Sequence, residues 1–507
     1  MFIIPATQAA SVQLDFASID NTLFTLDGTW GAERNLTKTE VRTGIFAVKS
    51  NSGYSSNIHN PFVILRNGKT YVAANLIYTG SHSESIEALP IGKSRFLSGL
   101  NENVFSWDLL PTTSFTTPEA VITLGKSVDE VSQKMHVFVK ENILSRHHQT
   151  RKPHVLLNSW EGIFFDFNRE KILKLAREAK AIGVDLFVLD DGWFGRRDDD
   201  TSSLGDWYDY QSKTGGLKSL VEEIKAIGLN FGLWFEPEMV NKNSDLYRNH
   251  PEFAMEIPGI APIERRHQLM LDFANPQVRD YIFDLMTKVI DDVKPNYLKL
   301  DANRVMSDMY THGLQNHGEY QHRYMLGLLD FWNKLSIRYS DILIEACSSG
   351  GNRFDLGTLY YFPQIWASDN TDALARIYIQ EGTLLGYPQS TMGTHVSHVP
   401  NTTTRKTTPL ESRFNVASIG AFGYELDLTK VNQHELSVMK NQIAFYREHS
   451  ELIFHGHYRR LISAYQKDAY VYMICDTEKN FNQAVVFVAL TKPTKQKIRF
   501  RVPGIST

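Results

Sequence analysis

The sequence predicts an α/β protein built on a (β/α)8 TIM barrel, with an N-terminal antiparallel β-sandwich and a small C-terminal β domain on either side. Three observations support this fold class. Strand-like and helix-like patterns alternate from His154 to about Gly456. Short alternating strand patterns, separated by Gly, Asn and Ser clusters, precede this region, and similar patterns return after it. A chain of 507 residues is also long enough for two or three domains.

The N-terminal part, residues 1–125, is expected to be the sandwich, of which the chain encodes only a portion. Its alternating runs include Ser11–Phe16, Tyr71–Tyr78 and Val121–Leu124. Alternation of apolar and polar side chains places one face of each strand on a core. These runs therefore predict half-buried strands.

Residues 126–153 are expected to form a linker helix and a connector. Ser127 and Glu130 have the spacing of a capping box, and an apolar pattern follows them to about Leu144. The basic stretch His147–Lys152 then predicts an exposed connection to the next domain.

The third part, residues 154–456, is expected to be the catalytic barrel. Helical patterns such as Leu217–Ile227, Val278–Val293 and Tyr324–Tyr339 separate its predicted strands. The eight strand candidates are Val155–Trp160, Leu186–Trp193, Phe231–Met239, Gln268–Phe273, Tyr297–Asn303, Ile342–Ser348, Gln364–Asp369 and Ser390–Ser397.

The last part, residues 457–507, is expected to be a small β domain that stops early. Alternating runs at Tyr470–Cys475, Ala484–Leu490 and Ile498–Val502 predict its strands. An incomplete sheet would expose strand edges, so we expect the shortened ends to affect solubility or assembly.

Composition excludes several classes of function. The formal net charge of −4, without a basic cluster, argues against a nucleic-acid partner. No apolar run is long enough to cross a bilayer, and the first residues lack the pattern of a signal peptide. Two cysteines are too few for a disulfide framework, which favours a reducing, cytoplasmic location.

The polar cluster that follows Tyr297–Leu300 is the strongest candidate for chemistry. Asp301 comes at the end of a predicted buried strand, the position where a barrel of this class carries its active site. Lys299 lies two residues earlier, points to the same side of the strand, and is expected to help keep Asp301 ionised. A purely structural ion pair is the alternative.

Other predicted strands also end in unusual polar or aromatic residues. Each cluster alone has an ordinary structural explanation, but all of them would meet at one mouth of the barrel. They comprise Asp190-Asp191-Gly192-Trp193, Trp234-Phe235-Glu236, Arg265-Arg266-His267, Glu345-Ala346-Cys347, Trp366-Ala367-Ser368-Asp369 and His395.

The sequence contains no convincing pattern for a metal site or a nucleotide-binding site. His395 and His398 lack convincing zinc spacing, and the acidic run Asp198–Asp200 lacks the alternating pattern of a calcium loop. No glycine-rich phosphate loop follows a predicted strand. We therefore expect no metal and no cofactor. Two carboxylates on different strands, Asp301 and Asp369, instead indicate glycoside hydrolysis.

At these residues the chain resembles glycoside hydrolase family 36, the bacterial-type α-galactosidases. The resemblance extends over nearly the whole chain. The matching stretches are Ser55–Phe62, Asn158–Glu161, Val188–Phe194, Gly232–Met239, Lys299–Arg304, Cys347–Gly351, Trp366–Asp372, Thr394–Ser397 and Thr408–Glu411.

The resemblance implies a retaining α-galactosidase acting on melibiose- or raffinose-type sugars, commonly as a tetramer or dimer. It implies that Asp301 is the nucleophile and Asp369 the acid/base, and that Asp190 and Asp191 bind galactose hydroxyls. Trp160 would lie near the mouth of the site. Other residues implied to bind the sugar are Trp234, Arg266, Lys299, Asn303, Cys347 and Gly350.

This chain departs from the family pattern at two positions beside the nucleophile. Leu300 stands where the family usually has Trp, and Ala302 stands where Met is common. Both changes reduce bulk near the sugar. Related activities, an α-N-acetylgalactosaminidase or a galactosyl transferase, remain alternatives, as does a non-catalytic fragment.

Overall fold

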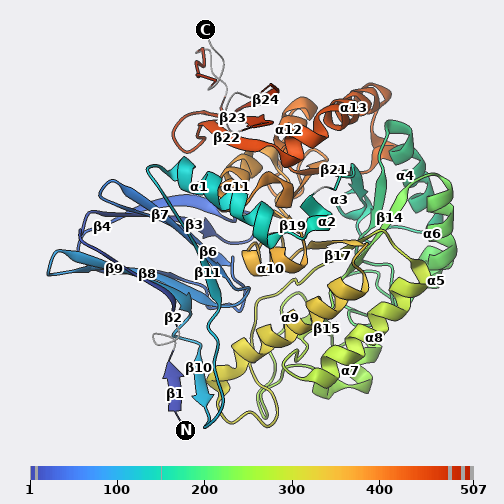
Figure 1. Cartoon of the computed structure of the whole chain (residues 1–507). Coiled ribbons are helices and arrows are strands. Elements are labelled where there is room, and N and C mark those ends of the chain that lie inside the picture. The colour runs from blue at the N-terminus through green and yellow to red at the C-terminus, as the bar shows by residue number, and fades with distance from the viewer. Residues whose placement is uncertain (1, 6–9, 150, 478–481, 493–496, 503–507) are drawn as a thin grey trace.

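The computed structural model describes residues 2–5, 10–149, 151–477, 482–492 and 497–502. Figure 1 shows the N-terminal sheets in blue beside the barrel, which runs from green to orange. The red C-terminal sheet lies above the barrel and beside the helix α1. Among the described residues, no helix is both long enough and apolar enough to cross a membrane.

Two antiparallel sheets form the N-terminal part. One has the strand order β11-β7-β6-β3-β4 and the other β2-β9-β8-β5, and a separate ribbon pairs β1 (Phe2–Pro5) with β10 (Ser106–Leu109). Leu23, Leu65 and Phe96 are buried in a cluster that draws on both sheets, which confirms the predicted sandwich. The strands are β2 (Ala10–Phe16), β3 (Asn21–Gly28), β4 (Asn35–Val41), β5 (Gly44–Lys49), β6 (Ile58–Asn67), β7 (Thr70–Ile77), β8 (His82–Leu89), β9 (Lys93–Leu100) and β11 (Glu119–Gly125).

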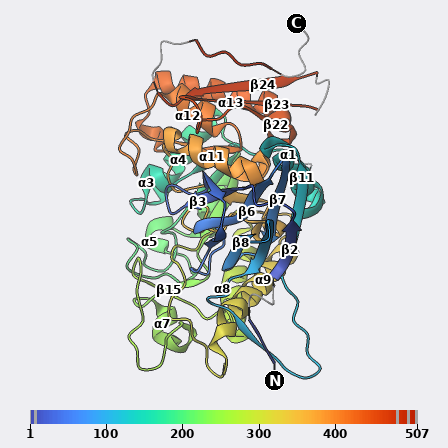
Figure 2. The same ribbon diagram turned by 90° about the vertical axis from the view of Figure 1, so that its left-hand side faces the viewer.

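The predicted linker helix is α1 (Val128–Phe138), continued by one wider helical turn, η2 (Val139–Ile143). Ser127 caps it, because its hydroxyl accepts the backbone N–H of Glu130 at 3.1 Å. Figure 2 shows α1 next to β7 and β11. The helix also contacts α11 of the barrel, so it packs the sandwich against the barrel.

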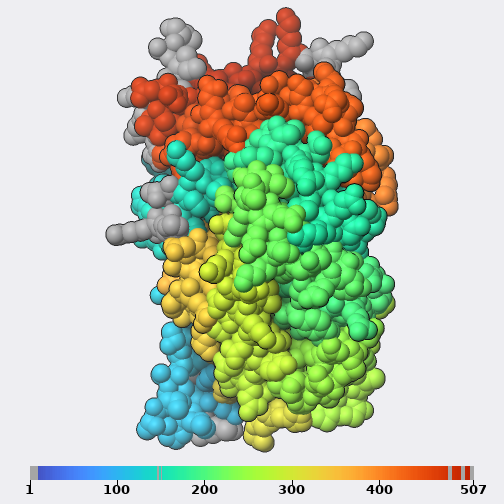
Figure 3. Space-filling view, turned by 90° about the vertical axis from the view of Figure 1, so that its right-hand side faces the viewer, coloured from blue at the N-terminus to red at the C-terminus, as the bar shows by residue number. Residues whose placement is uncertain are grey.

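Eight parallel strands close the barrel in the order β12-β13-β14-β17-β18-β19-β20-β21. Their bounds are β12 (Leu156–Asn158), β13 (Leu186–Leu189), β14 (Asn230–Phe235), β17 (Tyr297–Leu300), β18 (Leu343–Ala346), β19 (Gln364–Trp366), β20 (Met392–Ser397) and β21 (Ala421–Glu425). The main helices around them are α4 (Arg169–Ile182), α6 (Leu217–Ala226), α8 (Pro276–Val293), α9 (Tyr320–Arg338), α10 (Leu356–Tyr361), α11 (Ala373–Gly386), α12 (Leu410–Ala417) and α13 (Gln433–His455). Figure 3 shows one outer face of the molecule, where green and yellow residues of the barrel lie below the orange and red residues of the C-terminal part.

One predicted barrel strand was wrong. Gln268–Phe273 lies outside the barrel, where β16 (Gln268–Met270) pairs antiparallel with β15 (Met239–Asn241) in the long connection between β14 and β17. A short apolar run does not distinguish a buried ribbon from a barrel strand. The missed strand is β21, and Asp301 and Asp369 therefore follow the fourth and sixth barrel strands rather than the fifth and seventh.

The C-terminal sheet contains β22 (His457–Ile462), β23 (Ala469–Cys475) and β24 (Ala484–Leu490). The prediction of a strand at Ile498–Val502 was wrong, because residues 497–502 form no strand; β22 supplies the third strand instead. Residues 478–481, 493–496 and 503–507 of this part lie outside the described residues. The proposed domain boundaries remain predictions.

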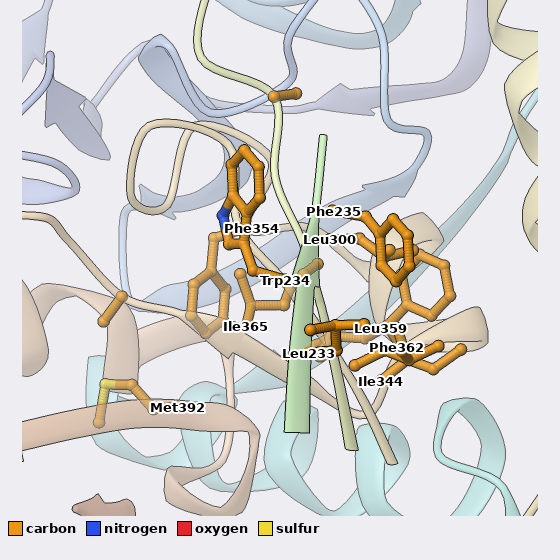
Figure 4. Packing of buried hydrophobic residues seen from close by; sticks show 14 of the residues in the cluster. Leu233, Trp234, Phe235, Leu300, Ile344, Phe354, Leu359, Phe362, Ile365 and Met392 are labelled. Atoms are coloured by element: carbon orange, nitrogen blue, oxygen red, sulfur yellow. The ribbon is translucent and has the colours of Figure 1, made fainter. Parts of the chain in front are cut away.

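The strand β14 illustrates how the barrel separates its core from its site. Leu233, Trp234 and Phe235 lie among apolar side chains from neighbouring strands and α10, as Figure 4 shows. Successive side chains of a strand point to opposite faces. Trp234 therefore lines the central cavity, while Leu233 and Phe235 pack on the other side.

Candidate active site

A cavity of about 970 Å³ opens at the carboxyl ends of the barrel strands. Nine of the eleven predicted site residues line it. They are Trp160, Asp190, Asp191, Trp234, Arg266, Lys299, Asn303, Asp301 and Asp369. Cys347 and Gly350 are not among its lining residues and lie behind the two catalytic candidates.

Asp301 is held by hydrogen-bond donors on both carboxylate oxygens. Oδ2 accepts Asn303 Nδ2 at 2.8 Å and Trp234 Nε1 at 3.3 Å. Oδ1 accepts the backbone N–H groups of Ala302 at 2.8 Å and Ser349 at 3.3 Å. Four converging donors suit an anionic carboxylate and fix its orientation.

Asp369 follows β19 and has different surroundings. Trp30 Nε1 donates to Oδ2 at 2.8 Å, and Trp366 Nε1 donates to Oδ1 at 3.1 Å. Burial by the surrounding protein and the nearby charge of Asp301 raise the pKa of Asp369, against the opposing effects of Trp30, Lys299 and Arg266. A raised pKa suits a carboxyl group that carries a proton to the leaving group.

Asp190 and Lys299 form a buried ion pair in the floor of the cavity. Asp190 Oδ2 accepts Lys299 Nζ at 2.8 Å and Asn158 Nδ2 at 2.8 Å. Lys299 was expected to support Asp301. In the structure, its ammonium group donates directly to Asp190 rather than to Asp301. Burial opposes its charge, but attraction to Asp190 and other acidic groups raises the pKa of Lys299, which therefore stays protonated.

Asp191 and Arg266 occupy the next part of the wall. Asp191 makes a two-pronged ion pair with the buried Arg197, at 2.5 Å from Nε and 2.9 Å from Nη2. Such paired geometry holds a carboxylate in one orientation. Arg266 is in the loop between β15 and β16, and its pKa rises because Glu236, Asp301, Asp191 and Asp369 together outweigh the effect of burial.

Cys347 and Gly350 support the two carboxylates from behind. Burial, with the neighbouring charge of Asp301, raises the pKa of the Cys347 thiol, so it stays protonated. Gly350 has φ +79°, and a Cβ there would lie 2.8 Å from the backbone nitrogen of Asp369. Any larger residue would push the loop carrying Asp369 away.

Trp160 stands at the mouth of the cavity, in the short helix α3 (Trp160–Ile163) after β12. Its ring packs edge-on against Phe164 and Phe165, with centroids 5.2 and 5.1 Å away. Asn158 Oδ1 accepts its backbone N–H at 2.7 Å. An aromatic face at this position suits the C–H side of a sugar ring.

Sequence reasoning gave no role to Glu236 and Trp366, and it missed Trp30 entirely; all three shape the site. Glu236 and Trp366 lie within the strand-end motifs quoted above, and their position there is the signal that could have assigned them to the site. Burial and the charge of Asp301 raise the pKa of Glu236 to about 8. Trp30 carried no such signal, because it lies in a loop of the sandwich 339 residues away from Asp369.

Within the described parts of the chain, no three His, Cys, Asp or Glu side chains gather as a metal site would require. Asp199 bonds to Thr201, Asp198 to Tyr210 and Lys213, and His395 Nδ1 to Glu425 at 2.8 Å. These contacts give each group an ordinary structural partner. The expectation of a metal-free, cofactor-free reaction stays a prediction.

Comparison with known proteins assigns the chain and its fold to one family. The Melibiase family profile matches residues 114–456, and the profile of the glycosyl hydrolase family 36 N-terminal domain matches residues 4–110. This chain belongs to glycoside hydrolase family 36. Two curated relatives are α-galactosidases, and each alignment covers nearly all of this family 36 chain but only about two thirds of the relative.

Alpha-galactosidase AgaA of Geobacillus stearothermophilus is 39% identical over 99% of this chain and 70% of its own length. Alpha-galactosidase Mel36A of Lactobacillus acidophilus is 42% identical over 95% of this chain and 67% of its own length. The crystal structure of AgaA superposes with a TM-score of 0.95, at 38% identity, over 98% of this family 36 chain and 71% of AgaA. The shared architecture includes the sandwich, the barrel and the C-terminal sheet.

Proposed function

We propose that this chain is a retaining exo-acting α-galactosidase that removes terminal non-reducing α-D-galactose from melibiose- and raffinose-type oligosaccharides. One observation supports this most strongly. Asp301 and Asp369 line the same cavity, but four donors converge on Asp301, whereas the pKa of Asp369 is raised. Two carboxyl groups whose surroundings differ in this way are suited to the roles of nucleophile and acid/base.

In the first step, an oxygen of Asp301 attacks the anomeric carbon from the side opposite the α-linked leaving group. The glycosidic C–O bond breaks as Asp369 gives its proton to the departing oxygen, and a β-linked galactosyl ester forms on Asp301. In the second step, Asp369 removes a proton from water, which attacks the same carbon and frees Asp301. Two inversions leave the α configuration in the released galactose.

Binding of galactose is assigned to the floor and wall of the cavity. Asp190 and Asp191 supply carboxylate acceptors for hydroxyl groups, and Lys299 supplies a donor beside Asp190. Trp234, Arg266, Asn303 and Trp160 would complete the contacts. Crystal structures of AgaA variants contain raffinose and stachyose, which supports the choice of oligosaccharide.

Azide rescue of two variants tests the roles separately. In Asp301→Ala, azide replaces the missing nucleophile on the β side, so an aryl α-galactoside should yield β-galactosyl azide. In Asp369→Ala, the ester on Asp301 still forms from an activated aryl substrate, and azide should yield α-galactosyl azide. Proton NMR of the anomeric signal distinguishes the two products.

The same anomer from both variants, or near-normal hydrolysis by Asp301→Ala, would contradict the proposal. Asp369→Ala should also lose about 10²–10⁴-fold in kcat/KM on raffinose, since a sugar leaving group needs the proton, and much less on an aryl substrate. Raffinose hydrolysis unaffected by Asp369→Ala would remove the acid/base role.

We also infer a cytoplasmic enzyme that assembles as a homo-oligomer and needs no nucleic-acid partner. The cytoplasm is favoured because two cysteines, Cys347 and Cys475, are too few for a disulfide framework. A tetramer or dimer is expected from the family resemblance alone. Light scattering coupled to gel filtration tests the assembly.

A further inference from the structure

The turn between β3 and β4, residues 29–34, leaves the N-terminal sheet and enters the mouth of the barrel. Its anchor is Arg34, which is 1% exposed. Arg34 Nε donates to Thr383 Oγ1 at 2.9 Å, Nη1 donates to the carbonyl of Gly351 at 2.6 Å, and Nη2 donates to the carbonyl of Ala367. These contacts join the turn to α11 and to the loops after β18 and β19.

The turn is also bound to both chain neighbours of Asp369. Ser368 Oγ donates to Glu33 Oε2 at 2.5 Å, and Asn370 Nδ2 donates to the carbonyl of Gly31 at 2.9 Å. These two bonds therefore hold the turn in a fixed position relative to the loop after β19. Another side chain of the turn, Trp30, donates to the carboxyl group of Asp369, which lies between those neighbours.

Trp30 is 53% exposed, lines the cavity, and donates through Nε1 to Asp369 Oδ2. Trp366 Nε1 holds the other oxygen. A half-exposed indole contributes little to the core. Its well-directed bond at 2.8 Å, on a turn with a buried anchor, indicates a role in the site rather than in folding.

We propose that Trp30 is a positioning residue for the general acid/base, supplied to the barrel by the N-terminal sheet. It orients the Asp369 carboxyl group and, by bonding to its charged form, sets the pH above which that group loses its proton. This inference rests on the proposed acid/base role of Asp369. It assigns the N-terminal sheet a part in the reaction.

The direction of the pH effect follows from the groups that face Asp369. Removal of the Trp30 N–H group takes away a bond that favours the carboxylate, so the pKa of Asp369 should rise. The other titratable and charged groups around it stay in place in such a variant. They are Glu33 of the turn, Arg266, Lys299, Asp301, Cys347, Arg376 and Glu425.

The test is the pH dependence of kcat/KM for Trp30→Phe on raffinose and on p-nitrophenyl α-galactoside. The basic limb for raffinose should move up by about one pH unit, because protonated Asp369 persists to higher pH. Activity on raffinose at the optimum should fall about tenfold as the carboxyl group loses its orientation. The activated aryl substrate, which needs little protonation, should lose much less.

Trp107→Phe is the matched control, since Trp107 is another indole of the N-terminal part, packed on Phe115 and Arg323 away from the cavity. It should leave both pH profiles unchanged. A second variant replaces Trp30 with 3-(3-benzothienyl)alanine, in which sulfur takes the place of the N–H group while the ring keeps its shape. The thermal midpoint of each variant reports on folding.

An unmoved basic limb in both Trp30 variants would overturn the inference, even if activity falls. A shift that appears equally in Trp107→Phe would do the same. Failure of the proposed function gives a different result, because Asp369→Ala would then hydrolyse raffinose normally. The two failures are therefore separable in one set of assays.

Discussion

Asn303 links Glu236 to Asp301 through a single amide group. Its Nδ2 donates to Asp301 Oδ2 at 2.8 Å and to Glu236 Oε2 at 3.1 Å, and its backbone N–H donates to Glu236 Oε1 at 2.5 Å. Glu236 is fully buried. The orientation of the proposed nucleophile thus depends on a carboxyl group that the substrate does not need to touch.

Glu236 makes stability depend on pH. Burial and Asp301 raise its pKa to about 8 in the folded protein from an ordinary value of 4.5. Between these values the folded chain binds a proton that the unfolded chain lacks, so this group makes the free energy of unfolding fall as pH rises from about 4.5 to 8. Glu236→Gln should reduce that slope, as measured by urea unfolding at several pH values. Glu119→Gln, an exposed carboxyl group, is the control; an equal slope in Glu236→Gln and the unmodified chain would contradict the assignment.

A double-displacement mechanism requires a particular distance between the two catalytic carboxyl groups. If the enzyme retains configuration, the Asp301 and Asp369 carboxyl groups should lie about 5–5.5 Å apart when galactose is bound. A crystal structure of Asp369→Asn with an oligosaccharide would measure it. A separation beyond about 8 Å in that complex would favour an inverting mechanism instead.

Specificity for galactose should depend on the Asp190–Lys299 pair. A site built to bond a hydroxyl group rejects an analogue that misplaces it, because buried polar groups are then left unpaired. We expect kcat/KM for α-galactosides to exceed that for α-glucosides by about 10⁴ or more. Asp190→Asn should lower activity on galactosides about 10²-fold or more, because it removes the charge that balances Lys299. Comparable rates of the unmodified chain on both sugars would be incompatible with this assignment.

Removing the Arg34 contacts that hold the N-terminal sheet on the barrel should lower the free energy of unfolding substantially. Arg34→Ala removes a buried cation and leaves the carbonyl groups of Gly351 and Ala367 without their donor. The expected loss in the free energy of unfolding is about 3–5 kcal/mol. Chemical denaturation measures it, and limited proteolysis should show earlier cleavage within residues 1–125. Arg42→Ala, at an exposed ion pair, should change stability by about 0–1 kcal/mol. A similar small change in Arg34→Ala would show that the turn is not a structural anchor.

Prediction from sequence succeeded where the signal is local. Asp301 and Asp369 were expected at the mouth of the barrel because a buried strand that ends in acidic residues is visible in a few consecutive positions, and both line the cavity there. The barrel class followed from alternating patterns in the same way. The assignment of individual strands failed at Gln268–Phe273, because a short apolar run has the same composition in a ribbon as in a barrel.

The sequence by itself determined the alternating architecture, the acidic strand ends and the family, since each depends on neighbouring residues or on motifs. Only the tertiary structure decided which groups meet: Lys299 with Asp190, Asn303 with both Glu236 and Asp301, and Trp30 with Asp369. Apart from Asn303 and Asp301, these partners are far apart along the chain, and packing that local patterns do not encode brings them together. Burial then decides which of the clustered carboxyl groups keeps a proton, because the cost of charge depends on the surroundings that only the folded chain creates.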